Sequence, residues 1–225
     1  IEPLAVRAPD RAAHGCRDIL RDGVAQQLCS AASKCAEIDL VCEMIRTAAR
    51  AGVDSLRYNT CILPIDRTEQ EEGRGGYYHT AFRLDKMSEQ EQSELTDAGR
   101  VTAEMHWERI EYLLERMIPV AEEFKVRLGN SQEDPPTPPG YKGVDKVLND
   151  FEGMKRFIEI QRSPYNGWNF CVGSIAEMLD DSANEIYPFI EYFGSRNTIF
   201  LVHYRTLYMK IAHFLCHYLH LFIVM

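Results

Sequence analysis

The feature of this sequence that most constrains its fold is a repeated order of helical and strand-like apolar patterns. Apolar residues first recur at helical spacing, and a short apolar run with strand character then follows. This order occurs four times, with helices expected over 38–49, 104–124, 151–158 and 186–193 and strands over 53–59, 126–130, 168–172 and 198–203. Strands that alternate with helices pair in parallel through right-handed crossovers, so the sequence predicts an α/β fold.

Two architectures fit this order, an open doubly wound sheet and an eight-stranded (β/α)8 barrel, the TIM barrel. Both place ligands at the carboxyl ends of the strands. An open nucleotide-binding sheet would carry a GxGxxG or Walker motif after a strand, and the sequence shows neither. We therefore favour the barrel. The polar, Gly-rich stretch 67–99 is too long for a simple connection and is expected to be a functional loop or lid.

The composition is that of a globular protein and narrows the classes of partner. Of the 225 residues, 45% are apolar and 26% are charged, enough to bury a sizeable core. The formal net charge of -9 argues against a nucleic-acid partner, because contacts to phosphates need clustered Lys and Arg. Seven cysteines, an odd number, are typical of a reducing compartment and predict a cytoplasmic protein. The sequence leaves open whether copies associate into a homo-oligomer.

The two ends of the chain differ from the rest. The sequence starts with Ile1 and shows no signal peptide, so we expect its start to be a fragment boundary. Residues 211–225 are nearly all apolar or His, yet this stretch is shorter than the about 20 residues that cross a bilayer, which argues against a membrane span. Within it, His213, His217 and His220 would share one face of a helix. That spacing is compatible with metal or haem, but no carboxylate or Cys is arranged around it.

Candidate chemistry lies where the expected strands end, at Asn59, Ser131, Cys171 and His203. A thiolate and an imidazole on successive strands form a ligand pair suited to zinc, iron or manganese-type ions. The alternative is structural, because Cys is often buried and a single His is often a hydrogen-bonded core residue. Position at the barrel mouth is what favours the metal hypothesis.

Charged residues near the same strand ends extend the candidate site. Arg57 and Arg205 are expected to clamp a substrate carboxylate, or else to be solvated surface arginines. Glu133 and Asp134 are candidates for a general acid/base pair or for an added oxygen ligand. Because these two lie on a Pro-rich loop, the composition favours solvated charges instead.

Longer stretches resemble the D-mannonate dehydratase family, hydro-lyases with a TIM barrel of the xylose-isomerase-like type. The similarity runs in order from Ile38 to Arg205, about three quarters of the chain. It is carried by VCEMIRTAARAG with LRYN, RTEQEEGRGG, MHWERIEYLLERMIPVAEEFKVRL, DPPTPPGYKGVDKVL, SPYNGWNFCVGSIAEML and EIYPFIEYFGSRNTIFLVHYR.

The resemblance implies a function and a cofactor. Family members bind Mn²⁺ or Fe²⁺ and remove water from D-mannonate, a small sugar acid, giving 2-keto-3-deoxy-D-gluconate in hexuronate (glucuronate) catabolism. The family's metal ligands are a His in an HPxDP motif, a Cys in an FCxG motif, a His in a VHxR motif and an Asp further along. Cys171 and His203 match the second and third of these. Arg57, Asn59 and Arg205, which lie at or near strand ends, are the residues that we expect to bind the substrate.

The sequence departs from the family at its first ligand and at both ends. Ser131 stands where the family has the His of HPxDP, and a neutral hydroxyl is a poor transition-metal ligand. Residues 1–35 and 206–225 match nothing in the family, so we expect residues 36–205 to form a partial barrel that lacks the first and last strands. Two alternatives to an active lyase remain, a non-catalytic remnant and a protein that associates with a membrane or partner through its apolar tail.

Overall fold

Four parallel strands form the centre of the computed structural model, which describes residues 34–72, 75–210 and 213–224. These strands pair side by side in chain order, each parallel to the next. They are β1 (Ser55–Asn59), β4 (Arg127–Ser131), β5 (Asn166–Cys171) and the first part of β6 (Ile199–Lys210). The predicted α/β class with a parallel sheet is therefore confirmed.

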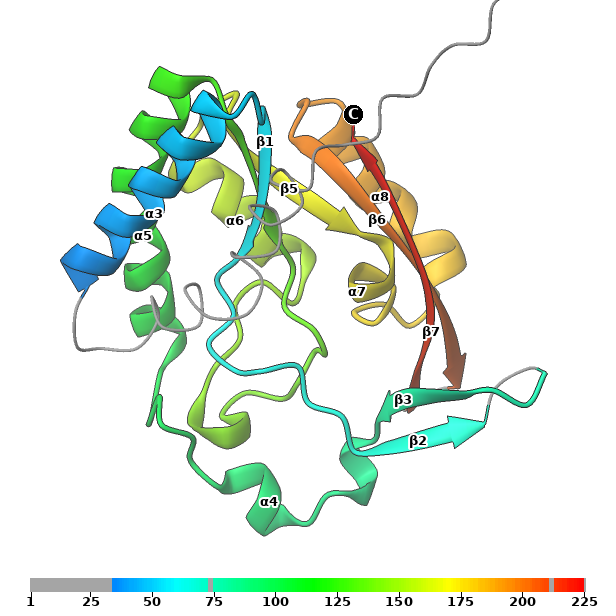
Figure 1. The fold of residues 1–225 in the computed structure, drawn as a ribbon. Helices are drawn as coiled ribbons and strands as arrows, with labels where there is room; N and C mark the ends of the chain where they lie inside the picture. Colours follow the sequence, from blue (N-terminus) through cyan, green and yellow to red (C-terminus); the bar gives the residue numbers. More distant parts are fainter. Residues whose placement is uncertain (1–33, 73–74, 211–212, 225) are drawn as a thin grey trace, which may run out of the picture.

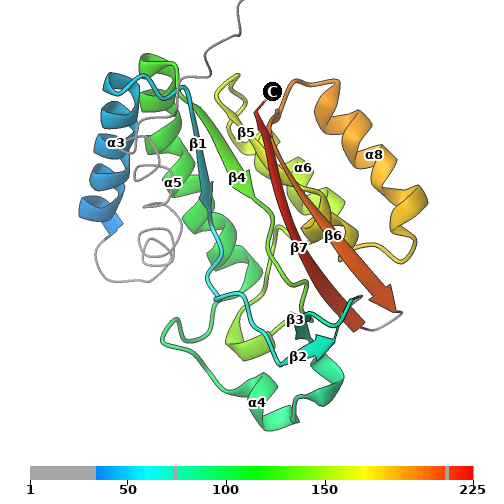
Figure 2. The ribbon, with the colours of Figure 1, turned by 45° about the vertical axis from the view of Figure 1, so that its right-hand side comes forward.

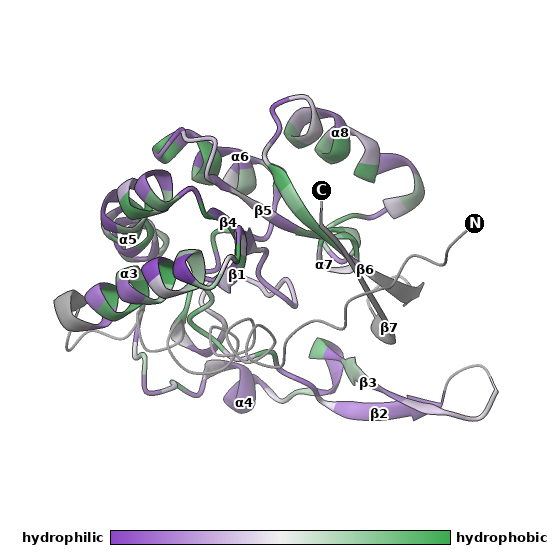
Figure 3. Cartoon of the chain, turned by 45° about the horizontal axis from the view of Figure 1, so that its top comes forward, coloured by the Kyte–Doolittle hydropathy of each residue, from purple (hydrophilic) through white to green (hydrophobic). Residues whose placement is uncertain are grey.

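Helices cover one side of these strands, as Figure 3 shows from above. They are α3 (Lys34–Arg50), α5 (Ala103–Phe124), α6 (Phe151–Ile160) and α8 (Ser182–Gly194), with the short α7 (Val172–Ala176) after β5. Local signals set the helix starts. The Thr102 side chain accepts a hydrogen bond from the Met105 N–H at the start of α5, and Asp150 caps the Gly153 N–H at the start of α6.

The alternation of side chains along the strands separates a helix-side face from an opposite face. Leu56, Leu128 and Trp168 are fully buried and belong to one apolar core with residues of α3, α5, α6 and α8. Since successive strand residues point to opposite faces, the residues next to these in β1, β4 and β5 lie on the side away from the helices. We call that side the inner face.

After β6 the sheet continues with antiparallel strands instead of a further helix–strand pair. These are β7 (His213–Val224), β3 (Tyr78–Phe82) and β2 (Glu69–Glu72), which complete the order β1-β4-β5-β6-β7-β3-β2 (Figure 1). The helical face proposed for His213, His217 and His220 is therefore wrong, because the backbone there is extended and pairs with β6 and β3. Apolar and aromatic residues at this density favour strand pairing.

The stretch 67–99 is not a plain loop. Besides the β2–β3 hairpin it contains a 3-10 turn, η1 (Leu84–Lys86), and the short helix α4 (Glu89–Ser93), which starts with a capping box between Ser88 and Glu91. A second small core, with Ile62, Phe82 and Val144 among its members, supports it. Figures 1 and 2 place this segment beyond the carboxyl ends of the parallel strands. Within the described residues, no helix is long and apolar enough to cross a membrane.

Gly153 in the first turn of α6 occupies a position with no room for a side chain. A Cβ there would overlap the Val147 carbonyl oxygen and lie 3.1 Å from the Val147 carbonyl carbon. Gly153→Ala is therefore expected to destabilise the protein by about 2 kcal/mol, the usual scale of overpacking, although Ala normally favours a helix. Urea unfolding measures this change. Gly194→Ala is the control, because a Cβ at Gly194 meets nothing within 4 Å; equal stability of wild type and Gly153→Ala would contradict the prediction.

Candidate functional site

The four strand ends lie in register at one end of the parallel sheet. Asn59 is the Cα partner of Ser131, and Ser131 is the Cα partner of Asn169 on β5. Two residues further along, Cys171 is the Cα partner of His203 on β6. Partner residues on neighbouring parallel strands lie about 4.8 Å apart and point to the same face. The structure therefore brings these side chains to one edge of the inner face.

A hydrogen bond shows that the strand ends turn their side chains toward each other on this face. Asn169 donates from Nδ2 to the Ser131 hydroxyl at 3.0 Å. Arg57 lies on the same face of β1, one pleat earlier than Asn59, because Leu56 and Tyr58 on either side of Arg57 pack into the helix-side core. Arg205 lies on β6, but its side chain is outside the described part of the structure.

Cys171 is held at the junction between β5 and α7. The thiol is buried, and its Sγ accepts a hydrogen bond from the Ser174 N–H at 3.4 Å. Its own backbone N–H donates to the Gln132 Oε1 at 3.0 Å, which ties β5 to the residue that follows Ser131. His203, its register partner, is 9% exposed and so is also buried.

These residues do not complete a site for a divalent ion. Cys171 and His203 supply a thiol and an imidazole in register, and Ser131 adds only a neutral hydroxyl that is already bonded to Asn169. No group of three or more His, Cys, Asp or Glu side chains suited to a metal ion occurs among the described residues. Because divalent selectivity needs a completed and supported ligand set, we derive no step through Mn²⁺ or Fe²⁺.

The prediction that Glu133 and Asp134 are solvated charges is wrong. Glu133 is 1% exposed, and its Oε2 accepts the backbone N–H groups of Val147 and Leu148 at 2.7 and 2.8 Å. Asp134 is also buried, and its Oδ2 accepts the Ser174 hydroxyl at 3.4 Å. Glu133 therefore fastens the residues just after β4 to Val147 and Leu148 at the far end of the Pro-rich loop, and Asp134 contacts the short helix α7 that follows Cys171. A role of Glu133 and Asp134 as a general acid/base pair stays a prediction.

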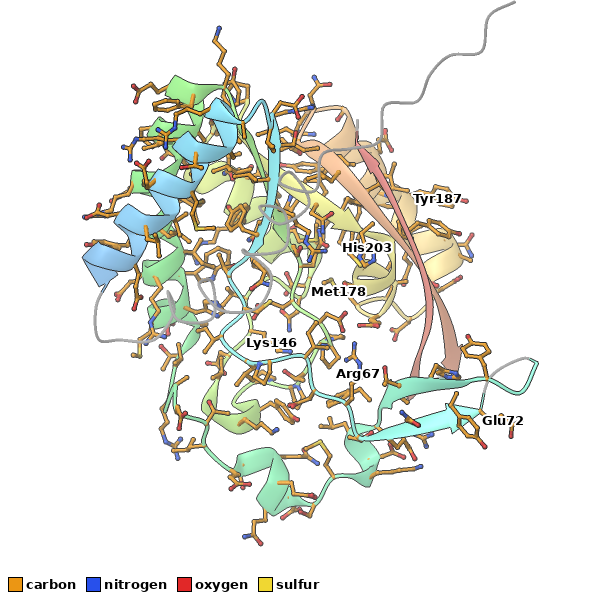
Figure 4. The ribbon with its side chains drawn as sticks, viewed as in Figure 1. Arg67, Glu72, Lys146, Met178, Tyr187 and His203 are labelled. Carbon is orange, nitrogen blue, oxygen red and sulfur yellow. The ribbon has the colours of Figure 1, made fainter. Side chains whose placement is uncertain are left out.

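Two cations that the sequence analysis did not single out lie beside this loop. The Arg67 Nη2 is 3.9 Å from the Asp134 Oδ1, and the Lys146 Nζ donates to the Pro135 carbonyl oxygen. Figure 4 shows both side chains in the central region below the strand ends, whereas Glu72 and Tyr187 lie at the periphery. Both cations follow a parallel strand, Arg67 after β1 and Lys146 after β4, which is the one sequence signal that could have found them.

A buried tyrosine anchors the loop that carries Arg67. The Tyr141 hydroxyl donates to the Asp66 Oδ2 at 2.7 Å, and the Lys142 Nζ lies 3.0 Å from the same oxygen. Burial, together with the adjacent Asp66 carboxylate, raises the pKa of Tyr141. Burial also raises the pKa of Tyr58 on the helix-side face of β1. Both phenols therefore stay neutral near pH 7, and Tyr141 remains a donor to Asp66.

The sequence is similar to mannonate dehydratases. The sequence profile of the D-mannonate dehydratase (UxuA) family matches residues 98–217, beyond the expected boundary at Arg205. The mannonate dehydratase of Thermotoga petrophila is 33% identical over 138 residues, 61% of this chain and 36% of that protein. The mannonate dehydratase of Thermotoga neapolitana is 33% identical over 162 residues, which cover 69% of this chain and 43% of that protein. The chain thus spans less than half the length of these curated relatives.

The fold resembles those of solved structures, two of which are a mannonate dehydratase and the IOLI protein. The crystal structure of mannonate dehydratase from Streptococcus suis serotype 2 superposes with a TM-score of 0.70 at 24% identity, covering 86% of this chain and 54% of that one. The crystal structure of the IOLI protein with a bound zinc atom gives a TM-score of 0.50 at 13% identity, covering 87% and 61%. At these identities the superpositions show a shared fold and nothing further about the site.

Proposed function

The chain belongs to the D-mannonate dehydratase family, and from that premise we propose that its site binds a six-carbon sugar acid and removes water from it. D-mannonate is the proposed substrate and 2-keto-3-deoxy-D-gluconate the product, a step of hexuronate catabolism. The observation that carries the proposal is the alignment of Ser131, Asn169, Cys171 and His203 on one face at the carboxyl ends of parallel strands. Barrel enzymes of this type place their sites at that end.

The charges around the site support an anionic substrate. Lys146 is half-buried beside the loop after β4, and Arg57 lies on the inner face of β1. Arg67 is half-buried as well, but the Asp134 carboxylate 3.9 Å away offsets part of its charge. Partly buried cations attract a carboxylate more strongly than fully solvated ones, because the surrounding dielectric is lower. Loss of water from a sugar acid begins with removal of the proton beside its carboxylate, and nearby positive charge stabilises the negative charge that develops.

Dehydration of D-mannonate tests the proposal. We expect the purified chain to bind D-mannonate and to convert it far more slowly than a family member that has His at the Ser131 position, because the described donors do not complete a metal site. Calorimetry measures binding, and NMR detection of the 2-keto acid, with and without added Mn²⁺, measures turnover. Absence of binding would overturn the proposed substrate. The Cys171→Ser, His203→Asn double variant is the control for turnover by a contaminating enzyme.

A second candidate is a non-catalytic family member that retains the sugar-acid site. The hydrogen bond between Ser131 and Asn169 favours it, because this bond occupies the hydroxyl at the position of the lost ligand. Binding of D-mannonate without any 2-keto acid would select this candidate. The third alternative, membrane or partner association through 206–225, depends on side chains outside the described part, and the division into segments 1–35, 36–205 and 206–225 stays a prediction.

A further inference from the structure

Only one of the two polar side-chain atoms of Asn169 has a hydrogen-bond partner among the described residues. The residue is 1% exposed, and its Nδ2 donates to the Ser131 hydroxyl at 3.0 Å. Its Oδ1 is buried and has no hydrogen-bond partner among the described residues. Buried side-chain oxygens in folded proteins are nearly always hydrogen-bonded, so an exception at a candidate site indicates a group that a ligand or an ordered water satisfies.

The neighbours of Asn169 on the inner face offer no partner for this oxygen. The Cα partner of Asn169 on β6 is Leu201. Two residues before Asn169 on the same face of β5 is Gly167, whose Cα partner on β4 is Gly129. A Cβ at Gly129 would come within 2.9 Å of the Asn169 backbone nitrogen and 2.8 Å of the Leu201 Cδ1. The strands therefore pack closely beneath Asn169 and form an apolar floor. A hydrogen-bond donor has to approach from the other side, where Cys171 and His203 lie.

Asn169 differs in position from the other buried asparagines of β4 and β5. Asn130 and Asn166 also have an Oδ1 with no partner in the described part of the chain. Both lie on the helix-side face, because Asn130 is in register with Trp168 and Asn166 with Leu128. Asn169 alone among these three belongs to the inner face and to the carboxyl end of its strand.

We propose that Asn169 is a specificity-determining residue, whose Oδ1 accepts a hydrogen bond from one hydroxyl group of the sugar acid. The inference rests on the proposed function, since it takes that ligand class as given. Ser131 positions the amide by accepting from Nδ2, which leaves Oδ1 as an acceptor only. An acceptor rejects the carboxylate end of a ligand and selects a neutral donor. The site therefore favours polyhydroxy acids over acids that lack the hydroxyl.

The test compares binding of D-mannonate to the full chain and to Asn169→Leu, which keeps a similar volume without the amide. We expect the dissociation constant from calorimetry to rise about tenfold, the effect of one lost hydrogen bond to a ligand. Among the 2-deoxy, 3-deoxy and 4-deoxy hexonates, one should bind equally well to both proteins. That compound lacks the hydroxyl that Asn169 contacts, so replacing Asn169 by Leu no longer changes its dissociation constant.

Asn166→Leu is the matched control, because Asn166 lies on the same strand, is also 1% exposed and also has an Oδ1 without a partner in the described chain. It should leave the dissociation constant unchanged. Thermal melting by circular dichroism confirms that each variant is folded. If Asn169→Leu fails to fold, Ser131→Ala replaces it and is expected to weaken binding about threefold, since the amide is then no longer oriented.

The outcomes separate this inference from the proposed function. If D-mannonate is dehydrated but Asn169→Leu binds it as tightly as wild type, the inference is overturned and the proposed function stands. If the variant loses affinity while no 2-keto acid forms, the inference is supported and the dehydration is rejected. If wild type binds no hexonate at all, both are overturned.

Discussion

Ser131→His is expected to bind Mn²⁺ about a hundredfold more tightly than the wild-type chain, since an added imidazole supplies a transition-metal ligand where a hydroxyl stood. The substituted position is in register with Asn169, two residues from Cys171 on the same face, and Cys171 is in register with His203. A third side-chain donor would therefore join the thiol and the imidazole. Equilibrium dialysis with metal analysis measures the gain.

Two controls make this result specific. Ser131→Ala removes the hydroxyl and breaks the hydrogen bond with Asn169 without adding a ligand, so its metal binding should equal that of wild type. Adding His203→Asn to the Ser131→His variant should abolish the gain, because the new imidazole then has only the thiol beside it. Equal Mn²⁺ uptake by wild type and Ser131→His would show that the missing His is not what limits metal binding.

Glu133→Ala is expected to lower the free energy of unfolding by about 4 kcal/mol, because two buried backbone N–H groups lose their acceptor at once and each costs about 1–3 kcal/mol. These are the N–H groups of Val147 and Leu148, both bonded to the Glu133 Oε2. The loss would release the loop over the strand ends. Urea unfolding followed by Trp fluorescence measures the change.

Two further substitutions serve as comparisons for the loss of unfolding free energy in Glu133→Ala. Glu133→Gln keeps an amide oxygen that can accept one or both N–H groups, so it should cost clearly less than Glu133→Ala. Glu108→Ala removes an exposed carboxylate from α5 and should change stability by no more than about 0.5 kcal/mol. If Glu133→Ala unfolds at the same urea concentration as Glu108→Ala, the carboxylate does not hold the loop.

Local patterns predicted the parallel part of the fold well. The apolar spacing that indicated a strand over 126–130 corresponds to β4, and the helix expected over 104–124 corresponds to α5. Such patterns depend on residues close in the sequence, which is why they can be recognised in the chain alone. The same approach failed for His213, His217 and His220, since helical spacing in a short apolar segment does not exclude a strand.

The candidate site was predicted in its position and only partly in its contacts. Strand order placed Cys171 and His203 at the same edge, and the structure has them as register partners. Asn169 was missed, although it lies two residues before Cys171 and so on the same face of the strand. Glu133 was misjudged because its burial depends on Val147 and Leu148, 14 and 15 residues away in the sequence.

The sequence by itself determined the helix–strand order, and its resemblance to the dehydratase family predicts that Ser131 stands where that family has a His ligand. Those features follow from residue identity and local periodicity. Only the tertiary structure decided that Asn169 bonds to Ser131, that Glu133 is buried and that β7 joins β6 to β3. Each of these depends on which distant segments pack together, because a hydrogen bond or a buried carboxylate exists only once its partners are within about 3 Å.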